Sequence, residues 1–81
     1  MNREQIITEV SEIARNVFQK DDLEFSDELN ASSFDTWTSL NFMQFLTEIE
    51  TKYGFKFKMM ELLKLKNMGA IVDSIMNHIS K

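Results

Sequence analysis

The chain has no cysteine, no proline and only two glycines among its 81 residues. Without cysteine it can form no disulfide, offers no thiolate ligand to a metal and has no cysteine nucleophile. Basic residues are also few, with 9 Lys and Arg against 13 Asp and Glu and a net charge of −4, which disfavours nucleic acid as a partner. No apolar run approaches the roughly twenty residues of a membrane span. We therefore expect no membrane partner, no signal peptide and a cytoplasmic protein.

The chain also lacks the residue sets that support catalysis or metal binding. It contains no Ser/His/Asp set, no glycine-rich phosphate loop and no zinc-ligand spacing, so we expect a protein that is not an enzyme. The acidic stretch at residues 21–28 lacks the ligand order and the central glycine of a calcium-binding EF-hand, and we interpret it as a solvated loop. The single histidine, His78, is expected in the last helical turn, where a cation favours the helix C-terminus.

What the sequence does contain is the apolar spacing of a small helical protein. With 43% hydrophobic residues the chain can build one core, and we predict a single domain spanning residues 1–81. Apolar residues recur at three- and four-residue intervals and predict four helices, at about residues 2–19, 39–53, 60–65 and 68–79. Gly54 is expected to end the second helix and Asn67 to cap the last one. The fold class is therefore all-α, with a long loop at residues 20–37.

Ser39 lies where the polar loop gives way to the second helix. A serine there has the unpaired backbone N–H groups of the first turn beside it and the positive end of the helix dipole behind it. A phosphate ester on its hydroxyl would therefore be electrostatically favoured. Serine and threonine are also the most common helix caps. From local sequence alone, an ordinary N-cap formed by Ser39 or Thr38 is the more common explanation.

The residues around Ser39 resemble a known family. Trp37-Thr38-Ser39-Leu40 precedes an amphipathic helix that closes with Tyr53-Gly54-Phe55, and Glu61-Leu62 and residues 67–72 follow in the same order. This pattern is similar to that of the acyl carrier protein family over nearly the whole chain. The resemblance implies a four-helix bundle with a long first loop and a short third helix. It also implies that 4′-phosphopantetheine from coenzyme A is attached to Ser39.

The same resemblance implies a function and partners. Carriers of this family hold an acyl or aminoacyl group as a thioester on the prosthetic arm and deliver it to separate enzymes of fatty acid, polyketide or nonribosomal peptide biosynthesis. The expected partners are a phosphopantetheinyl transferase and the loading and processing enzymes, which would dock on the helix at residues 39–53. Leu40 and Met43 either serve as exposed contacts there or pack under the long loop. We expect a monomer whose arm carries its only thiol.

Three positions depart from the family pattern. Thr38 replaces the aspartate that usually precedes the serine, and Asn41 and Gln44 replace carboxylates that fatty-acid-type carriers tend to have on the docking helix. Attraction to basic enzyme patches should therefore be weaker. The missing aspartate leaves an alternative open, an unmodified helical protein-interaction domain of the same fold.

The resemblance also implies that an acyl chain can be enclosed between the helices. The candidate lining residues, which are also ordinary core positions, are Phe45, Leu46, Ile49, Leu62 and Ile75.

Overall fold

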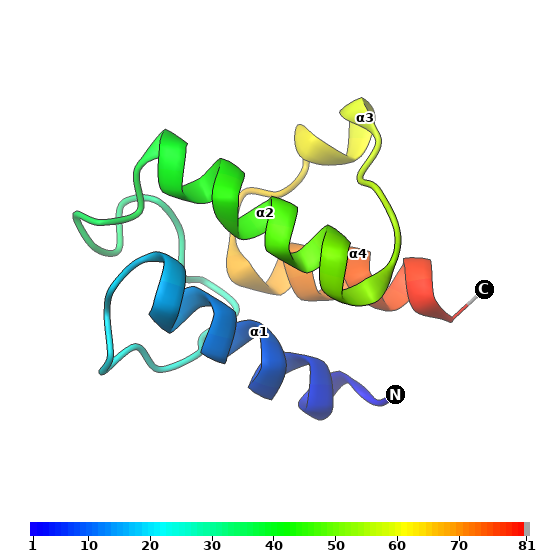
Figure 1. The fold of residues 1–81 in the computed structure, drawn as a ribbon, viewed down its shortest axis with the longest axis horizontal. Coiled ribbons are helices and arrows are strands. Elements are labelled where there is room, and N and C mark those ends of the chain that lie inside the picture. Colours follow the sequence, from blue (N-terminus) through cyan, green and yellow to red (C-terminus); the bar gives the residue numbers. More distant parts are fainter. Residues whose placement is uncertain (81) are drawn as a thin grey trace.

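The computed structural model describes residues 1–80 and contains four helices in that range. They are α1 (Arg3–Val17), α2 (Ser39–Tyr53), α3 (Met59–Leu62) and α4 (Met68–Ile79). Figure 1 shows α1, α2 and α4 as the body of the molecule, with the short α3 set apart from α1 at its edge. The long loop between α1 and α2 covers one end of this body. The prediction of an all-α fold with a long first loop and a short third helix is confirmed.

Side chains just outside the helices define where the helices begin. Asn2 caps α1 by accepting from the backbone N–H of Gln5, and Asn67 caps α4 by accepting from Ala70. Gly54 ends α2 with a φ of 73°, a left-handed conformation that glycine adopts without a Cβ clash. The predicted roles of Asn67 and Gly54 are thereby confirmed. The first helix is slightly shorter than predicted, because Phe18 already serves as its C-cap.

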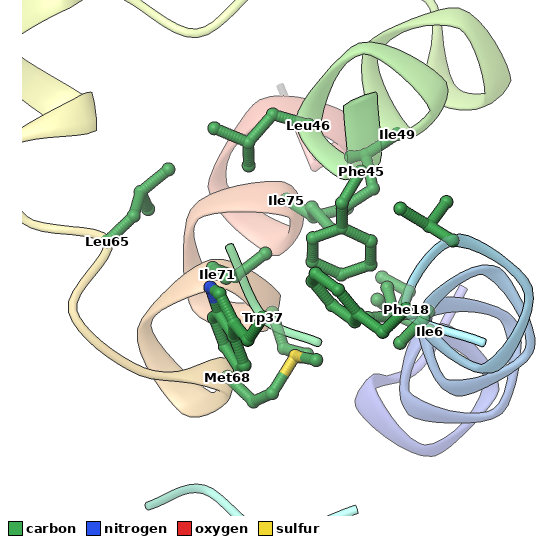
Figure 2. Packing of buried hydrophobic residues seen from close by; sticks show 14 of the residues in the cluster. Ile6, Phe18, Trp37, Phe45, Leu46, Ile49, Leu65, Met68, Ile71 and Ile75 are labelled. Carbon is green, nitrogen blue, oxygen red and sulfur yellow. The ribbon is translucent and has the colours of Figure 1, made fainter. Parts of the chain in front are cut away.

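The three long helices bury their apolar stripes against one another. Figure 2 shows Ile6 and Phe18 beside each other, with Phe45 and Ile49 of α2 above them and Ile71 and Ile75 of α4 toward their left. A phenolic hydrogen bond also joins two of the helices, since Tyr53 Oη donates to Glu9 Oε1 at 2.6 Å. The fully buried side chains of this core include Ile6, Val10, Phe18, Phe45, Ile49, Met68, Ile71, Val72 and Ile75.

The long loop is fixed to the start of α4. The backbone N–H groups of Met68 and Gly69 donate to the carbonyls of Leu29 and Asp27, at 2.8 and 3.0 Å. This close approach requires glycine, because a Cβ at residue 69 would lie 2.9 Å from the Asp27 Cβ. Arg3 adds an ion pair with Asp27 at 2.7 Å. A loop of this length is uncommon in a small domain unless it is held in this way or has a function of its own.

The third helix is shorter than the predicted residues 60–65. Helical bonding stops at Leu62, and the N–H of Lys64 then reaches back only three residues, to Glu61, in a tighter turn. This turn carries Leu65 into the core, where it is buried. No helix within residues 1–80 has the length and apolar character needed to cross a membrane.

Candidate functional site

Ser39 is the first residue of α2 and is exposed. Two residues earlier, Trp37 is 7% exposed and stacks on Phe18 with ring centroids 5.0 Å apart. Phe42, on the first turn of α2, lies 5.7 Å from the same indole ring. These aromatic contacts pack the start of α2 against the core. The backbone at Ser39 is therefore held in place while its side chain is exposed to solvent.

Thr38, and not Ser39, caps the helix. Its Oγ1 accepts from the N–H of Asn41 at 3.1 Å, and its carbonyl accepts from Phe42 at 2.8 Å. Asn41 in turn donates through its side chain to the carbonyl of Thr36 at 2.9 Å, which ties the first turn back to the loop. Within residues 1–80 the Ser39 hydroxyl forms no hydrogen bond. It is therefore free for chemistry that leaves the cap intact.

The start of α2 carries little negative charge. Its first turn contains no acidic residue, and the preceding cap residue, Thr38, is also neutral. Glu48 accepts from the side chain of Gln44 at 3.3 Å, and Glu50 accepts from the backbone N–H of Phe57 at 2.8 Å. Glu50 is therefore occupied in holding the connector to α3. Glu48 is left as the exposed carboxylate of this helix.

The outer surface of α2 is apolar near Ser39. Leu40 is 79% exposed and Met43 is 61% exposed, so neither packs under the loop. Of the two arrangements that the sequence allows, exposure on the surface of α2 is confirmed, and a contact role for these two side chains stays a prediction. Of the five residues considered for an enclosed acyl chain, four are buried in the core, whereas Leu62 is 40% exposed. The structure therefore brings together all of that set except Leu62.

The remaining predicted sites are structural. His78 is in the last turn of α4, as predicted, but its Nε2 lies 2.7 Å from Glu61 Oε2 on α3. The same carboxylate accepts from the N–H of Lys58 and the hydroxyl of Ser74. These bonds, the Lys58 N–H first among them, lower the pKa of Glu61. Sequence periodicity did not predict this pairing, because it joins residues 17 positions apart. The acidic loop and the rest of residues 1–80 contain no cluster of three metal-ligating side chains.

The fold and the exposed serine define a small helical domain that presents one hydroxyl at the start of a helix. The family described as phosphopantetheine attachment site matches residues 6–75, and the chain belongs to this family. The fold is similar to the solution NMR structure of holo acyl carrier protein from Geobacter metallireducens, with a TM-score of 0.87. The two share 32% sequence identity over 93% of this chain and 86% of that chain. A comparison with curated proteins gave no match.

Membership in this family identifies the chain as an acyl-carrier-type protein, which is not an enzyme, and its cofactor as covalently bound 4′-phosphopantetheine. The residues at the start of α2 fit such a group. The hydroxyl of Ser39 is exposed and unbonded, and the N–H groups of Ser39 and Leu40 precede the first intrahelical bonds. Such N–H groups, together with the helix dipole, favour a phosphodiester.

Proposed function

We propose that Ser39 carries 4′-phosphopantetheine and that the chain is a discrete carrier for an acyl or aminoacyl group. The observation that carries this proposal is the exposed, unbonded hydroxyl at the start of α2, inside the region that matches the family. The neighbouring polar side chains already form other hydrogen bonds and do not bond to the Ser39 hydroxyl. Thr38 caps the helix and Asn41 bonds to the loop.

The attachment step follows from this arrangement. A phosphopantetheinyl transferase binds coenzyme A, and the Ser39 oxygen attacks the phosphorus next to the pantetheine. A serine–phosphate bond forms, the pyrophosphate bond breaks, the serine proton passes to a base of the transferase and the adenosine bisphosphate leaves. The chain itself contributes an accessible nucleophile, held in place by the buried Trp37, and N–H groups that favour the product phosphodiester.

The attached group supplies a terminal thiol on which the cargo is held as a thioester. The chain positions that arm on α2 and offers the exposed Leu40 and Met43 to the enzymes that load and process the cargo. Tethering raises the effective concentration of the cargo at each docked active site. We propose that residues 1–81 act as one monomeric carrier domain, and that it works in the cytoplasm, where coenzyme A and the transferase are found.

Because the chain has no cysteine, its thiol content reports attachment of the prosthetic group directly. We expect incubation with coenzyme A and a phosphopantetheinyl transferase to add the mass of one phosphopantetheine and to raise the thiol content from none to one per chain. Ser39→Ala should abolish both changes while leaving the helical circular dichroism unchanged. Ser32→Ala, a change at an exposed serine in the preceding loop, is the matched control and should be modified normally.

Labelling that persists in Ser39→Ala would place the attachment elsewhere in the chain. Failure of the wild-type chain to react with several transferases would favour the alternative, an unmodified interaction domain of the same fold. The observation that keeps this alternative in view is Thr38, a neutral residue where the family usually has aspartate.

A further inference from the structure

A patch of exposed apolar side chains lies on and next to α3. Met59, Met60, Leu62 and Leu63 are 79%, 69%, 40% and 68% exposed. None of the four residues of α3 is buried, so this short helix contributes almost nothing to the core. Large apolar residues that gather on a protruding segment are unusual on a small protein and mark an interaction surface. We call these four residues the α3 patch.

The orientation of α3 explains why the patch faces outward. Glu61 is the residue of α3 that contacts the body of the protein, through Ser74 Oγ at 2.9 Å and His78 Nε2 at 2.7 Å. Residues two positions before and after Glu61 point away from it on a helix. Met59 and Leu63 occupy these two positions and are the most exposed with Met60. The contacts of Glu61 on the opposite side of α3 therefore hold the α3 patch in its outward orientation.

Lysines surround the α3 patch. All four are exposed, and none forms an ion pair within residues 1–80. Two cations elsewhere differ in this respect, because Arg3 pairs with Asp27 and Asp73, and Lys20 pairs with Asp22. The segment 55–66 thus has a net charge of +3 in a chain whose net charge is −4. The four lysines are Lys56, Lys58, Lys64 and Lys66.

We propose that the α3 patch and these four lysines bind the surface of an anionic lipid bilayer. Apolar side chains surrounded by lysine suit the interface, where methionine and leucine enter the acyl boundary and ammonium groups remain among the headgroups. Protein interfaces are enriched in methionine as well as in arginine and aromatic residues, but they are depleted in lysine. The four lysines therefore make a protein partner the poorer match. The exposed large apolar residues of the patch are all Met or Leu, and its cations are all lysine.

The charge distribution also sets an orientation. With +3 on the α3 segment, the rest of the chain has a strong excess of acidic residues. Anionic lipids would attract the α3 side and repel the remainder, so the protein should bind through one face. The sequence-based expectation of no membrane partner rested on the lack of a spanning segment, and peripheral binding requires no span. This inference is independent of whether Ser39 is modified.

The test is sedimentation of the purified chain with liposomes at low salt. We expect binding to vesicles of phosphatidylcholine with phosphatidylglycerol and little binding to phosphatidylcholine alone. Each lysine near such a surface contributes about 1 kcal/mol, so Lys64→Ala with Lys66→Ala should lower the partition coefficient roughly 10- to 30-fold. Added salt should weaken the wild type in the same direction.

Two further variants separate the α3 patch from exposed apolar surface in general. Met59→Ser with Leu63→Ser should lower partitioning at least about tenfold, because these side chains would no longer enter the acyl boundary. Leu40→Ser with Met43→Ser removes comparably exposed side chains from α2 and should bind like the wild type. All these positions are exposed, and thermal melting should confirm unchanged folding.

The proposal is wrong if the wild type does not bind anionic vesicles, a result that would leave an acidic protein surface as the better match for the lysines. It is equally wrong if binding is the same on neutral vesicles. Equal loss of binding in the α2 control would also overturn it, since the α3 patch would then have no special role.

Discussion

Ile75→Ala tests whether the core is packed as described, and its effect can be worked out from the structure. Ile75 is fully buried on α4, and Figure 2 shows it beside Phe45 of α2. The substitution removes about three methyl or methylene groups, worth about 0.8 kcal/mol each in transfer free energy. The cavity left behind adds to this loss, so we expect the free energy of unfolding to fall by about 2–5 kcal/mol. The total free energy of unfolding of a chain of this length is roughly 4–12 kcal/mol.

Urea unfolding followed by far-ultraviolet circular dichroism measures this loss directly. We expect the unfolding midpoint to move to lower urea with little change in slope, because the surface exposed on unfolding is nearly the same. Leu40→Ala is the matched control, since Leu40 is 79% exposed, and it should change stability by no more than about 0.5 kcal/mol. If the two variants lose equal stability, or if Ile75→Ala is neutral, the assigned core is wrong.

Two further predictions concern charge. Thr38→Asp, alone or with Gln44→Glu, should speed modification by a housekeeping phosphopantetheinyl transferase at low salt. Aspartate also caps helices, so the substitution mainly adds negative charge beside Ser39. Transfer kinetics that show no gain in rate, or a gain that added salt does not reduce, would contradict this prediction. Because contacts with Lys58, Ser74 and His78 lower the pKa of Glu61 from 4.5, its stabilising effect is present above about pH 4.5 and is lost as the pH falls through the lowered value. The melting-temperature gap between wild type and Glu61→Gln should therefore narrow from about pH 6 to about pH 3, and a constant gap would exclude this role.

The helices were predictable because their determinants are local. Apolar spacing located α1, α2 and α4 to within about two residues, and Asn67 and Gly54 mark their helix ends through their own side-chain and backbone properties. The location of Ser39 at the start of α2 was predictable for the same reason. Its identity as the candidate attachment residue came from the resemblance to a family, since an ordinary cap has the same local sequence.

Contacts between distant segments could not be predicted in this way. Nothing in the local pattern indicates that Glu50 accepts from the N–H of Phe57, or that His78 stacks on Phe55 with ring centroids 4.1 Å apart and reaches Glu61. The exposure of Leu62 follows from the same contacts, because Glu61 turns α3 so that its apolar side chains face solvent. Tertiary contacts thus decide which apolar residues are core and which are surface.

Under the proposed function, the distribution of charge on α2 limits how partner enzymes would recognise it. The first turn of α2 has no acid, and Glu50 is occupied by the connector, so Glu48 is the main charge that α2 can offer to a basic surface. If enzymes dock on α2 as proposed, we expect recognition to depend mostly on the exposed Leu40 and Met43 and on neutral hydrogen bonds. Apolar contacts are much less sensitive to ionic strength than exposed charge pairs. Docking of enzymes on α2 should therefore depend weakly on salt, whereas binding through the lysines around α3 should depend on it strongly, and this difference would allow the two surfaces to be told apart in one titration.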